Sequence, residues 1–287
     1  MTVSSESCGV VYVATGDKFL SEATASAESA KAAMPDVPIA LITDGRREPT
    51  GPFDLVVRHE EHSGTKRFKQ SMGLSPFQRS LFLDTDTYVA RDLREVFTVL
   101  DRFDLAVNQI SSGYHYDMPE VPHCFPELNS GVIAFRDTPE VQALFAEWSR
   151  LFDAYHVSDG WTWDQHSFRR ALYESPVRFA PLPIEYNFMP YVPAYFMAEV
   201  KVLHGRTHDR LVRIAEDVNH KLGARVFYPR IGTIRESTRM SARGLASFWG
   251  RTTRLVGYEA VSRTLSRLGV DRDWALHKLK GVGRGGG

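Results

Sequence analysis

Residues 79–87 read Arg-Ser-Leu-Phe-Leu-Asp-Thr-Asp-Thr, and this stretch decides how the rest of the chain is interpreted. An apolar run at residues 80–83 leads directly into two carboxylates, Asp84 and Asp86. Strand geometry predicts that both carboxylates lie on one face. In parallel α/β sheets, ligands bind beyond the carboxyl ends of the strands, where these side chains would emerge. Hard oxygen ligands there suit Mg²⁺ or Mn²⁺, and a solvated turn is the alternative interpretation.

Strand-like and helix-like segments alternate on both sides of this stretch. Strands are expected at residues 9–14, 38–43, 54–57, 104–107, 131–135 and 200–203. Helices are expected at residues 21–34, 139–152, 163–173, 209–222, 241–248, 258–268 and 273–279. This alternation predicts an α/β fold with a mainly parallel sheet flanked by helices. We expect a catalytic domain over residues 1–210 and a basic helical C-terminal extension over residues 211–287.

The composition is that of a globular protein. The chain has 287 residues, of which 43% are hydrophobic and 24% charged, so a well-packed core is expected. Two cysteines, Cys8 and Cys124, are too few for a disulfide framework and too far apart for a metal knuckle. No basic leader segment and no stretch of about 18 apolar residues is visible. A cytoplasmic protein without a nucleic-acid partner is therefore expected.

The segment around Asp84, Thr85 and Asp86 resembles the Asp-x-Asp motif of glycosyltransferases with the GT-A (Rossmann-like) fold, especially the glycogenin-like and bacterial galactosyltransferase-like family 8. The resemblance covers roughly residues 9–206 in ordered blocks. It implies a nucleotide-diphosphate-sugar donor bound over Mn²⁺ or Mg²⁺, with Asp84 and Asp86 as metal ligands and Thr85 beside the donor. It also implies transfer that retains the anomeric configuration.

Two further blocks carry residues that this resemblance assigns to the donor. Residues 11–17 resemble the family's opening strand and loop, which implies that Ala14 and Thr15 meet the nucleobase and Asp17 the ribose region. An ordinary βα loop is the alternative. Residues 128–135 resemble its Asn-x-Gly strand, so Asn129, Ser130 and Gly131 would line the donor-sugar pocket, where a glycine permits close approach.

Asp164 and Gln165 resemble the family's Asp-Gln pair beside the transferred sugar. With Asn129 they are the candidate catalytic residues, although Asp164 could instead be a simple N-terminal helix cap.

Residues 200–206 resemble the family's closing His-x-x-Gly-x-x-Lys segment, which makes His204 the third metal ligand. The spacing differs from that pattern, because Gly205 directly follows His204 and no Lys-Pro-Trp is present. Arg206 or His208 is therefore the proposed diphosphate contact. A histidine at a strand end can also be an ordinary polar residue, but an imidazole beside two carboxylates would favour Mn²⁺.

A basic cluster precedes the Asp-x-Asp segment, comprising Lys66, Arg67, Lys69 and Arg79. We expect Lys66 and Arg79 to bind the nucleotide or its diphosphate, and Arg79 is preferred because it lies closest to the strand. Solvated surface charges are the alternative. An aromatic loop with Tyr191, Tyr195 and Phe196 suits a sugar face or an apolar acceptor, but it could equally be core.

The C-terminal part is strongly basic. From Arg230 onwards the sequence contains ten Arg and two Lys against four acidic residues, so this part carries a charge of +8 in a chain with zero net charge. Apolar and arginine residues recur there at helical spacing. Such helices can lie on an anionic membrane surface, which would place the protein on the inner face of the membrane near a lipid-linked acceptor. Packing of the apolar stripe on the catalytic domain is the alternative.

Two other functions are compatible with the Asp-x-Asp motif. A haloacid-dehalogenase-type phosphohydrolase also has Asp-x-Asp at a strand end, but its motif requires Thr or Val where Tyr88 stands, and it normally opens the first strand. A non-catalytic nucleotide-sugar-binding protein is the second alternative. Assays of sugar transfer and of phosphate release distinguish the three: a glycosyltransferase transfers sugar, a phosphohydrolase releases phosphate, and a binding protein does neither.

Overall fold

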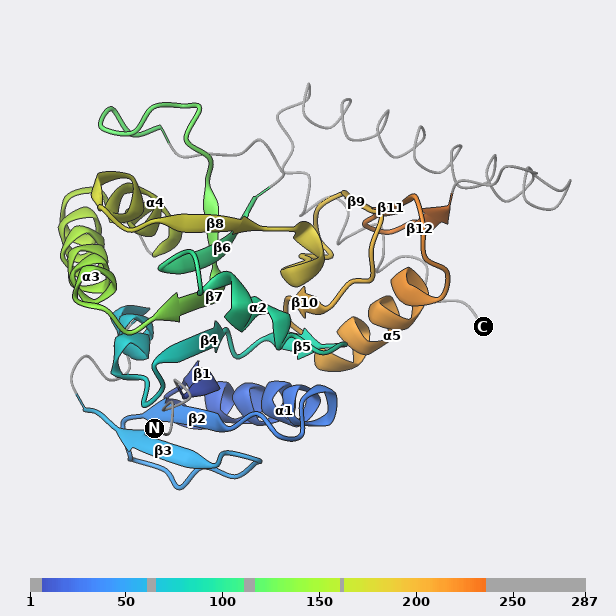
Figure 1. Ribbon diagram of the computed structural model, residues 1–287, viewed down its shortest axis with the longest axis horizontal. Coiled ribbons are helices and arrows are strands. Elements are labelled where there is room, and N and C mark those ends of the chain that lie inside the picture. Colours follow the sequence, from blue (N-terminus) through green and yellow to red (C-terminus); the bar gives the residue numbers. More distant parts are fainter. Residues whose placement is uncertain (1–6, 61–65, 111–116, 161–162, 236–287) are drawn as a thin grey trace, which may run out of the picture. The chain divides into compact units, whose positions relative to one another are not determined.

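The computed structural model describes residues 7–60, 66–110, 117–160 and 163–235. Figure 1 shows these elements in chain order: β1 (Cys8–Val13), α1 (Gly16–Ala33), β2 (Ile39–Thr43), β3 (Leu55–Arg58), η1 (Lys66–Leu74), β4 (Arg79–Leu83), β5 (Thr87–Val89), α2 (Glu95–Val99), β6 (Leu105–Gln109), β7 (Leu128–Arg136), α3 (Pro139–Asp159), α4 (Gln165–Glu174), β8 (Phe179–Leu182), η2 (Ile184–Tyr186), β9 (Ala194–Phe196), β10 (Val202–His204), α5 (His208–Asn219), β11 (Arg225–Tyr228) and β12 (Gly232–Arg235).

A seven-stranded sheet forms the centre, in the order β3-β2-β1-β4-β7-β6-β8. Neighbouring strands are parallel except at β7, which runs antiparallel to both β4 and β6. The predicted α/β fold with a mainly parallel sheet is confirmed. The reversal of β7 was not predicted, and it has a consequence for the site. Because β7 runs opposite to β4, the first residues of β7 lie at the edge where β4 ends.

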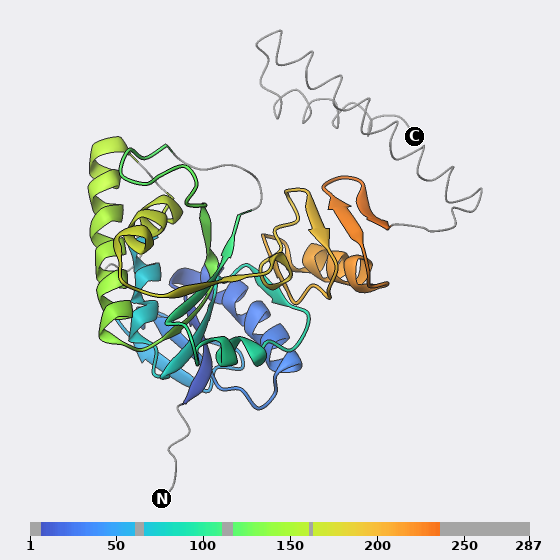
Figure 2. The ribbon, with the colours of Figure 1, turned by 45° about the horizontal axis from the view of Figure 1, so that its top comes forward.

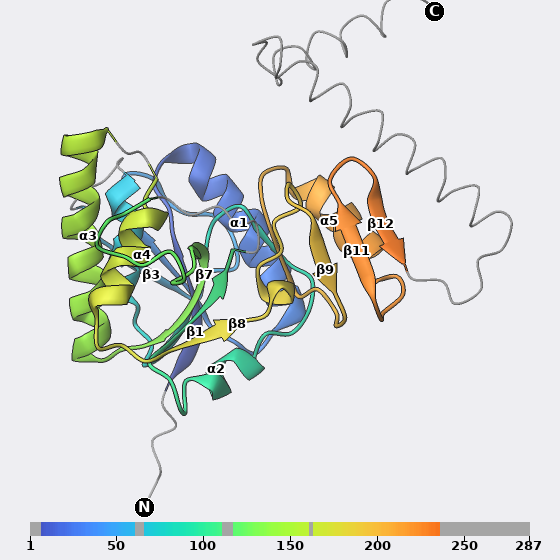
Figure 3. The ribbon, with the colours of Figure 1, turned by 90° about the horizontal axis from the view of Figure 1, so that it is seen from above.

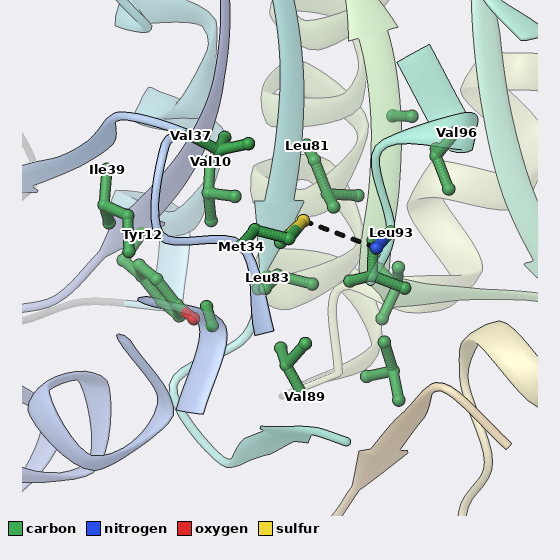
Figure 4. Packing of buried hydrophobic residues seen from close by; sticks show 14 of the residues in the cluster. Val10, Tyr12, Met34, Val37, Ile39, Leu81, Leu83, Val89, Leu93 and Val96 are labelled. Carbon is green, nitrogen blue, oxygen red and sulfur yellow. Dashed lines mark hydrogen bonds between the residues drawn. The ribbon is translucent and has the colours of Figure 1, made fainter. Parts of the chain in front are cut away.

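Side chains on the strands alternate between two core layers, as the two-residue period of a strand requires. Tyr12, Leu81 and Leu83 pack on the face that α1 and α2 cover, as Figure 4 shows. Phe82 and Phe135 point to the opposite face, which η1, α3 and α4 cover. Figure 3 shows α3 and α4 side by side on that face. Each fully buried side chain of this size contributes about 1.5–3 kcal/mol through the hydrophobic effect.

The ends of α3 follow from its sequence. Thr138 is its N-cap and accepts a hydrogen bond from the Val141 N–H at 3.3 Å, and Pro139 occupies the first turn, where its missing N–H costs nothing. Gly160 ends the helix with a φ of 66°, in the left-handed region that glycine tolerates. The helix expected at residues 139–152 therefore continues to Asp159.

The chain beyond β8 forms a smaller group of elements with its own apolar core. β10 pairs antiparallel with β5, and β9, β11 and β12 form a three-stranded sheet that packs with α5. Figure 2 shows α5 beside these strands. The strand expected at residues 200–203 is therefore not part of the central sheet, because its hydrogen bonds go to β5.

The compact unit that contains these elements runs from Met1 to Ile234. It includes α5 and β11, which lie past the boundary expected at residue 210, because both contribute buried side chains to the smaller core. The division into a catalytic domain and a C-terminal extension stays a prediction. The helices expected at residues 241–248, 258–268 and 273–279 lie outside the described residues.

Candidate active site

The Asp84–Asp86 turn directly follows β4, and hydrogen bonds fix its backbone. The Asp84 N–H donates to the Gly131 carbonyl at 2.8 Å, and the Thr87 hydroxyl donates to the Asp84 carbonyl at 2.8 Å. The Thr87 oxygen is 2.7 Å from the Ser26 hydroxyl, which is 2.9 Å from the Tyr12 hydroxyl. Because Thr87 already donates to a carbonyl, it accepts from Ser26, and Ser26 accepts from Tyr12. This buried chain connects α1 to the turn.

His204 lies opposite this turn because β10 pairs with β5, with His204 in register with Thr87. Its Nε2 is 3.3 Å from Asp86 Oδ1 and 3.6 Å from Asp84 Oδ2. One possible ligand atom from each of the three side chains lies within 4.8 Å of the others. The structure thus brings together the three residues that the sequence proposed as metal ligands. They reach one another through the small β5–β10 ladder, and not along the edge of one sheet.

Gly131 on β7 makes room for His204. A Cβ atom at this position would lie 2.1 Å from His204 Cε1 and 2.6 Å from its Nδ1, which real structures do not allow. The sequence predicts that this glycine permits close approach of the donor sugar. Its direct effect in this structure is that the imidazole can lie against the β7 backbone.

Lys69, on η1, connects the two acidic groups of the site. Its Nζ donates to Asp84 Oδ2 at 2.9 Å and to the Ser130 hydroxyl at 3.0 Å, and it is 3.6 Å from Asp164 Oδ2. Burial by itself would lower the pKa of Lys69, but the Asp164 and Asp84 carboxylates outweigh it and raise the pKa. Burial raises the pKa of Asp84. Burial acts in the same sense on Asp86, but its contacts with His204 and the charge of Arg206 together outweigh it and hold the pKa below the usual value.

The structure places Lys69 on the cleft, but not Arg79, which the sequence favoured. Arg79 begins β4, whereas the Asp84–Asp86 turn follows the other end of this strand. Its guanidinium donates to Asp101 at 2.5 Å and to the Phe97 carbonyl at 3.1 Å, away from the cleft. A strand advances about 3.3 Å per residue, so closeness in sequence to a strand is not closeness to its carboxyl end. Lys66 begins η1, and its side chain lies outside the described part.

Asn129, Gln165 and Asn187 form a buried amide network behind the proposed metal ligands. Asn129 Nδ2 donates to Gln165 Oε1 at 3.1 Å, and Asn187 Nδ2 donates to Asn129 Oδ1 at 2.8 Å. Asn187 Oδ1 lies 3.0 Å from His204 Nδ1. Gln165 Nε2 in turn donates to Glu127 Oε1 at 3.3 Å. Sequence reasoning missed Asn187 and Glu127, because nothing in the local pattern distinguishes them from core polar residues.

Asp164 stands at the N-cap position of α4, but its side chain makes no capping hydrogen bond. Its backbone carbonyl instead accepts from Trp148 Nε1 at 2.8 Å. Its Oδ2 atom is buried and has no hydrogen-bond partner among the described residues. The geometry therefore argues against the simple helix-cap interpretation.

A cleft of about 750 Å³ joins these groups. Predicted residues that line it are Ala14, Thr15, Asp17, Asp84, Thr85, Asp86, Asn129, Ser130, Gly131, Asp164, Gln165, His204 and Arg206, and Lys69 of the basic cluster lines it as well. Asp44, Arg46, Trp163 and Tyr191 also line it. Asp17 is exposed and pairs with Arg47 at 3.2 Å. The strand-end loops of β1, β2 and β4 and the start of β7 thus contribute to one cavity.

The segment after His204 supports the turn from the other side. The Gly205 N–H donates to the Asp86 carbonyl at 2.8 Å, and Gly205 lines a small neighbouring cavity, not the cleft. Arg206 does line the cleft, with its Nη1 3.4 Å from Glu22. His208 packs edge-on against Tyr88, with ring centroids 5.2 Å apart. Of the two candidate diphosphate contacts, only Arg206 is on the cleft.

The aromatic loop divides between two environments. Tyr191 lines the cleft. Phe196 is fully buried in the smaller core, whereas Tyr195 is exposed and does not line the cleft.

Comparisons with known proteins agree with this geometry. Residues 79–219 match the family model described as nucleotide-diphospho-sugar transferase. The structure of galactosyltransferase LgtC in complex with donor and acceptor sugar analogs is 17% identical, covers 72% of this chain and 95% of its own, and has a TM-score of 0.52. Glycosyltransferase GlyE of Streptococcus pneumoniae TIGR4 is also 17% identical, covers 70% and 55%, and has a TM-score of 0.52.

A search of curated proteins found no match. At 17% identity the two solved structures support the fold alone. The family model supports the reaction class. Neither gives support for the phosphohydrolase or for the non-catalytic alternative. The resemblance stated from the sequence is confirmed. The chain is therefore a glycosyltransferase of the GT-A fold that resembles family 8.

Proposed function

We propose that this enzyme transfers a sugar from a nucleotide-diphospho-sugar to a hydroxyl group of a saccharide or lipid-linked acceptor, with retention of the anomeric configuration. The observation that carries the proposal is the approach of Asp84, Asp86 and His204 on a cleft that also holds Lys69 and Asp164. The structure of LgtC with donor and acceptor sugar analogs supports such a pair of substrates.

The donor atoms of this cluster fit a divalent cation. Two carboxylate oxygens and an imidazole nitrogen form a mixed set that suits Mn²⁺ better than Mg²⁺, since Mg²⁺ prefers oxygen alone. A cation held there would neutralise charge on the diphosphate. Lys69 and Arg206 are the positive side chains that would contact the diphosphate or the sugar directly.

Transfer needs a defined exchange of bonds. The bond from the sugar's anomeric carbon to the diphosphate oxygen breaks, and the acceptor hydroxyl oxygen bonds to the same carbon and face. The hydroxyl proton passes to the departing diphosphate, so the products are a glycoside and a nucleoside diphosphate. Asp164 and Gln165 would support the sugar while positive charge develops on its ring, and no strong side-chain base is required.

The direct test is a screen of nucleotide-sugars for hydrolysis and for thermal protection with Mn²⁺ present. We expect one donor to be cleaved and to raise the melting temperature. NMR of the first-formed glycoside then reports the anomeric configuration. Inversion would contradict the retaining mechanism, and phosphate release without sugar transfer would contradict the function itself.

We predict that Asp164→Asn lowers kcat by about 10²-fold, because the variant loses a negative charge beside the transferred sugar. Donor KM should change little. Thermal stability should also be nearly unchanged, since the Asp164 side chain makes no capping hydrogen bond. Steady-state kinetics and a melting curve check both points. An equal loss of stability and activity would instead favour a purely structural role.

We predict that Trp163→Ala and Tyr191→Ala each raise the acceptor KM while donor hydrolysis persists. Both side chains line the cleft, yet they are 63% and 62% exposed, which suits stacking against a sugar face. An increase of about tenfold is expected for loss of one aromatic contact of about 1.5 kcal/mol. Tyr195→Ala is the matched control, because Tyr195 is similarly exposed at 56% but away from the cleft. Equal effects of all three variants would contradict the assignment.

Membrane association remains a prediction. No helix among the described residues combines the length and apolar character needed to cross a bilayer. Of the basic segment proposed to lie on anionic lipids, residues 236–287 fall outside the described residues, and these include its arginines from Arg239 onward. Co-sedimentation with anionic liposomes at low salt, before and after deletion of that segment, tests the idea.

A further inference from the structure

A continuous chain of hydrogen bonds runs from the proposed metal site to α4. It passes from His204 through the amides of Asn187 and Asn129 to Gln165, with contacts of 3.0, 2.8 and 3.1 Å. Asn187 is the central member, and it is fully buried. It follows η2 and does not itself line the cleft.

The direction of every bond in this chain follows from one backbone group. The Gly131 N–H donates to Asn129 at 2.9 Å, and a backbone N–H can only donate, so the accepting atom is Oδ1. Asn187 meets the same oxygen and must therefore present its NH₂ group there. Its carbonyl oxygen then faces His204 Nδ1, and this oxygen can only accept. The Nδ1 atom of His204 must carry the proton.

The consequence lies on the other side of the ring. A neutral imidazole with a proton on Nδ1 has its lone pair on Nε2, and Nε2 is the atom 3.3 Å from Asp86 and 3.6 Å from Asp84. The same chain ends at Gln165, whose Oε1 accepts from Asn129. Asn187 thus contacts both His204, the proposed metal ligand, and Asn129, which holds Gln165 of the proposed catalytic pair.

We propose that Asn187 is a positioning residue, which holds His204 in the tautomer that offers Nε2 to a divalent cation and which orients Gln165 through Asn129. The inference rests on the proposed metal-dependent function. Ligating histidines depend on such an acceptor behind the ring, and its loss typically weakens metal binding 10–100-fold.

Two substitutions separate the two contacts. Asn187→Leu removes both, so Mn²⁺ should bind about 10–100-fold more weakly. Asn187→Asp keeps an acceptor for His204 Nδ1 but has no hydrogen to donate to Asn129 Oδ1. This variant should bind Mn²⁺ at least as tightly as wild type, while its kcat at saturating Mn²⁺ falls about tenfold because Gln165 loses its orientation. Asn219→Leu is the control, since within the described part of the chain that amide bonds only to the Val200 backbone.

Two measurements decide the matter on the full chain. Long-range ¹H–¹⁵N NMR of the metal-free protein should show His204 protonated on Nδ1, with the signal identified by its loss in His204→Ala. Mn²⁺ titration followed by EPR gives the affinities without reference to turnover. A neutral imidazole with its proton on Nε2 and none on Nδ1, or Asn187→Leu protein that is folded and binds Mn²⁺ like wild type, would overturn the positioning role. Wild-type protein that binds no Mn²⁺ would overturn the proposed metal dependence instead.

Discussion

Replacement of Asp86 by Asn should reduce donor-sugar turnover by about 10²–10³-fold, the usual cost of removing one preorganised charge-stabilising group. Asp86 Oδ1 lies 3.3 Å from His204 Nε2, and the pKa of Asp86 is held below its usual value, so the side chain is a carboxylate at neutral pH. Asn has nearly the same shape but no charge. The rate should be measured with saturating Mn²⁺ and again after addition of EDTA, which should abolish it.

Asp101→Asn is the matched control for this experiment. Asp101 pairs with Arg79 at the opposite end of β4 and is exposed, so its loss should leave the rate unchanged. Undiminished turnover in Asp86→Asn, or in EDTA, would refute the metal assignment. A comparable loss in Asp101→Asn would show that the effect reports stability rather than chemistry.

Replacement of Lys69 by Met should lower both turnover and stability. The ammonium lies within 4 Å of Asp84 and Asp164, and among the described residues no other lysine or arginine forms an ion pair with either carboxylate. Breaking a buried pair costs about 3–5 kcal/mol and an exposed pair below about 1 kcal/mol. Lys69 is 18% exposed, so about 2 kcal/mol is expected for the metal-free protein. Turnover should fall about 10²-fold if Lys69 also contacts the donor.

Melting curves in EDTA and in Mn²⁺ test the electrostatic part of this prediction. A cation should stabilise the variant more than the wild type, because it supplies the missing positive charge. Lys31→Met is the control, since Lys31 is also 2.9 Å from a carboxylate, Asp54, but at the surface. Equal destabilisation by both substitutions, or no extra effect of Mn²⁺, would contradict the role given to Lys69.

Local patterns predicted the elements whose signal is local. The apolar run before Asp84 predicts a buried strand from its own residues alone, and β4 lies where that strand was expected. The direction of β7 could not be predicted, because its residues alternate in the same way whichever end comes first. Short strands such as β5 and β9 carry three residues each, which is too little for a periodic signal.

The site residues divide in the same way. Asp84 and Asp86 were found because a strand precedes them, and His204 was found through the family resemblance. Lys69 was ranked below Arg79 because only distance along the sequence was available. Asn187 was given no role from the sequence, since its importance depends on an imidazole 17 residues away. Side chains whose function is to orient another side chain leave no pattern of their own.

The pairing of β5 with β10 also fixes when the enzyme becomes complete during its synthesis. Residues 87–89 leave the ribosome long before residues 202–204, with which they pair. At a synthesis rate of about 5–20 residues per second, His204 is added on the order of ten seconds after Asp86. Lys69 and Asp84 are both synthesised before residue 202, so their ion pair does not depend on β10, whereas the cluster with His204 does. A nascent chain arrested before residue 202 could fold much of its large sheet but would acquire no third ligand.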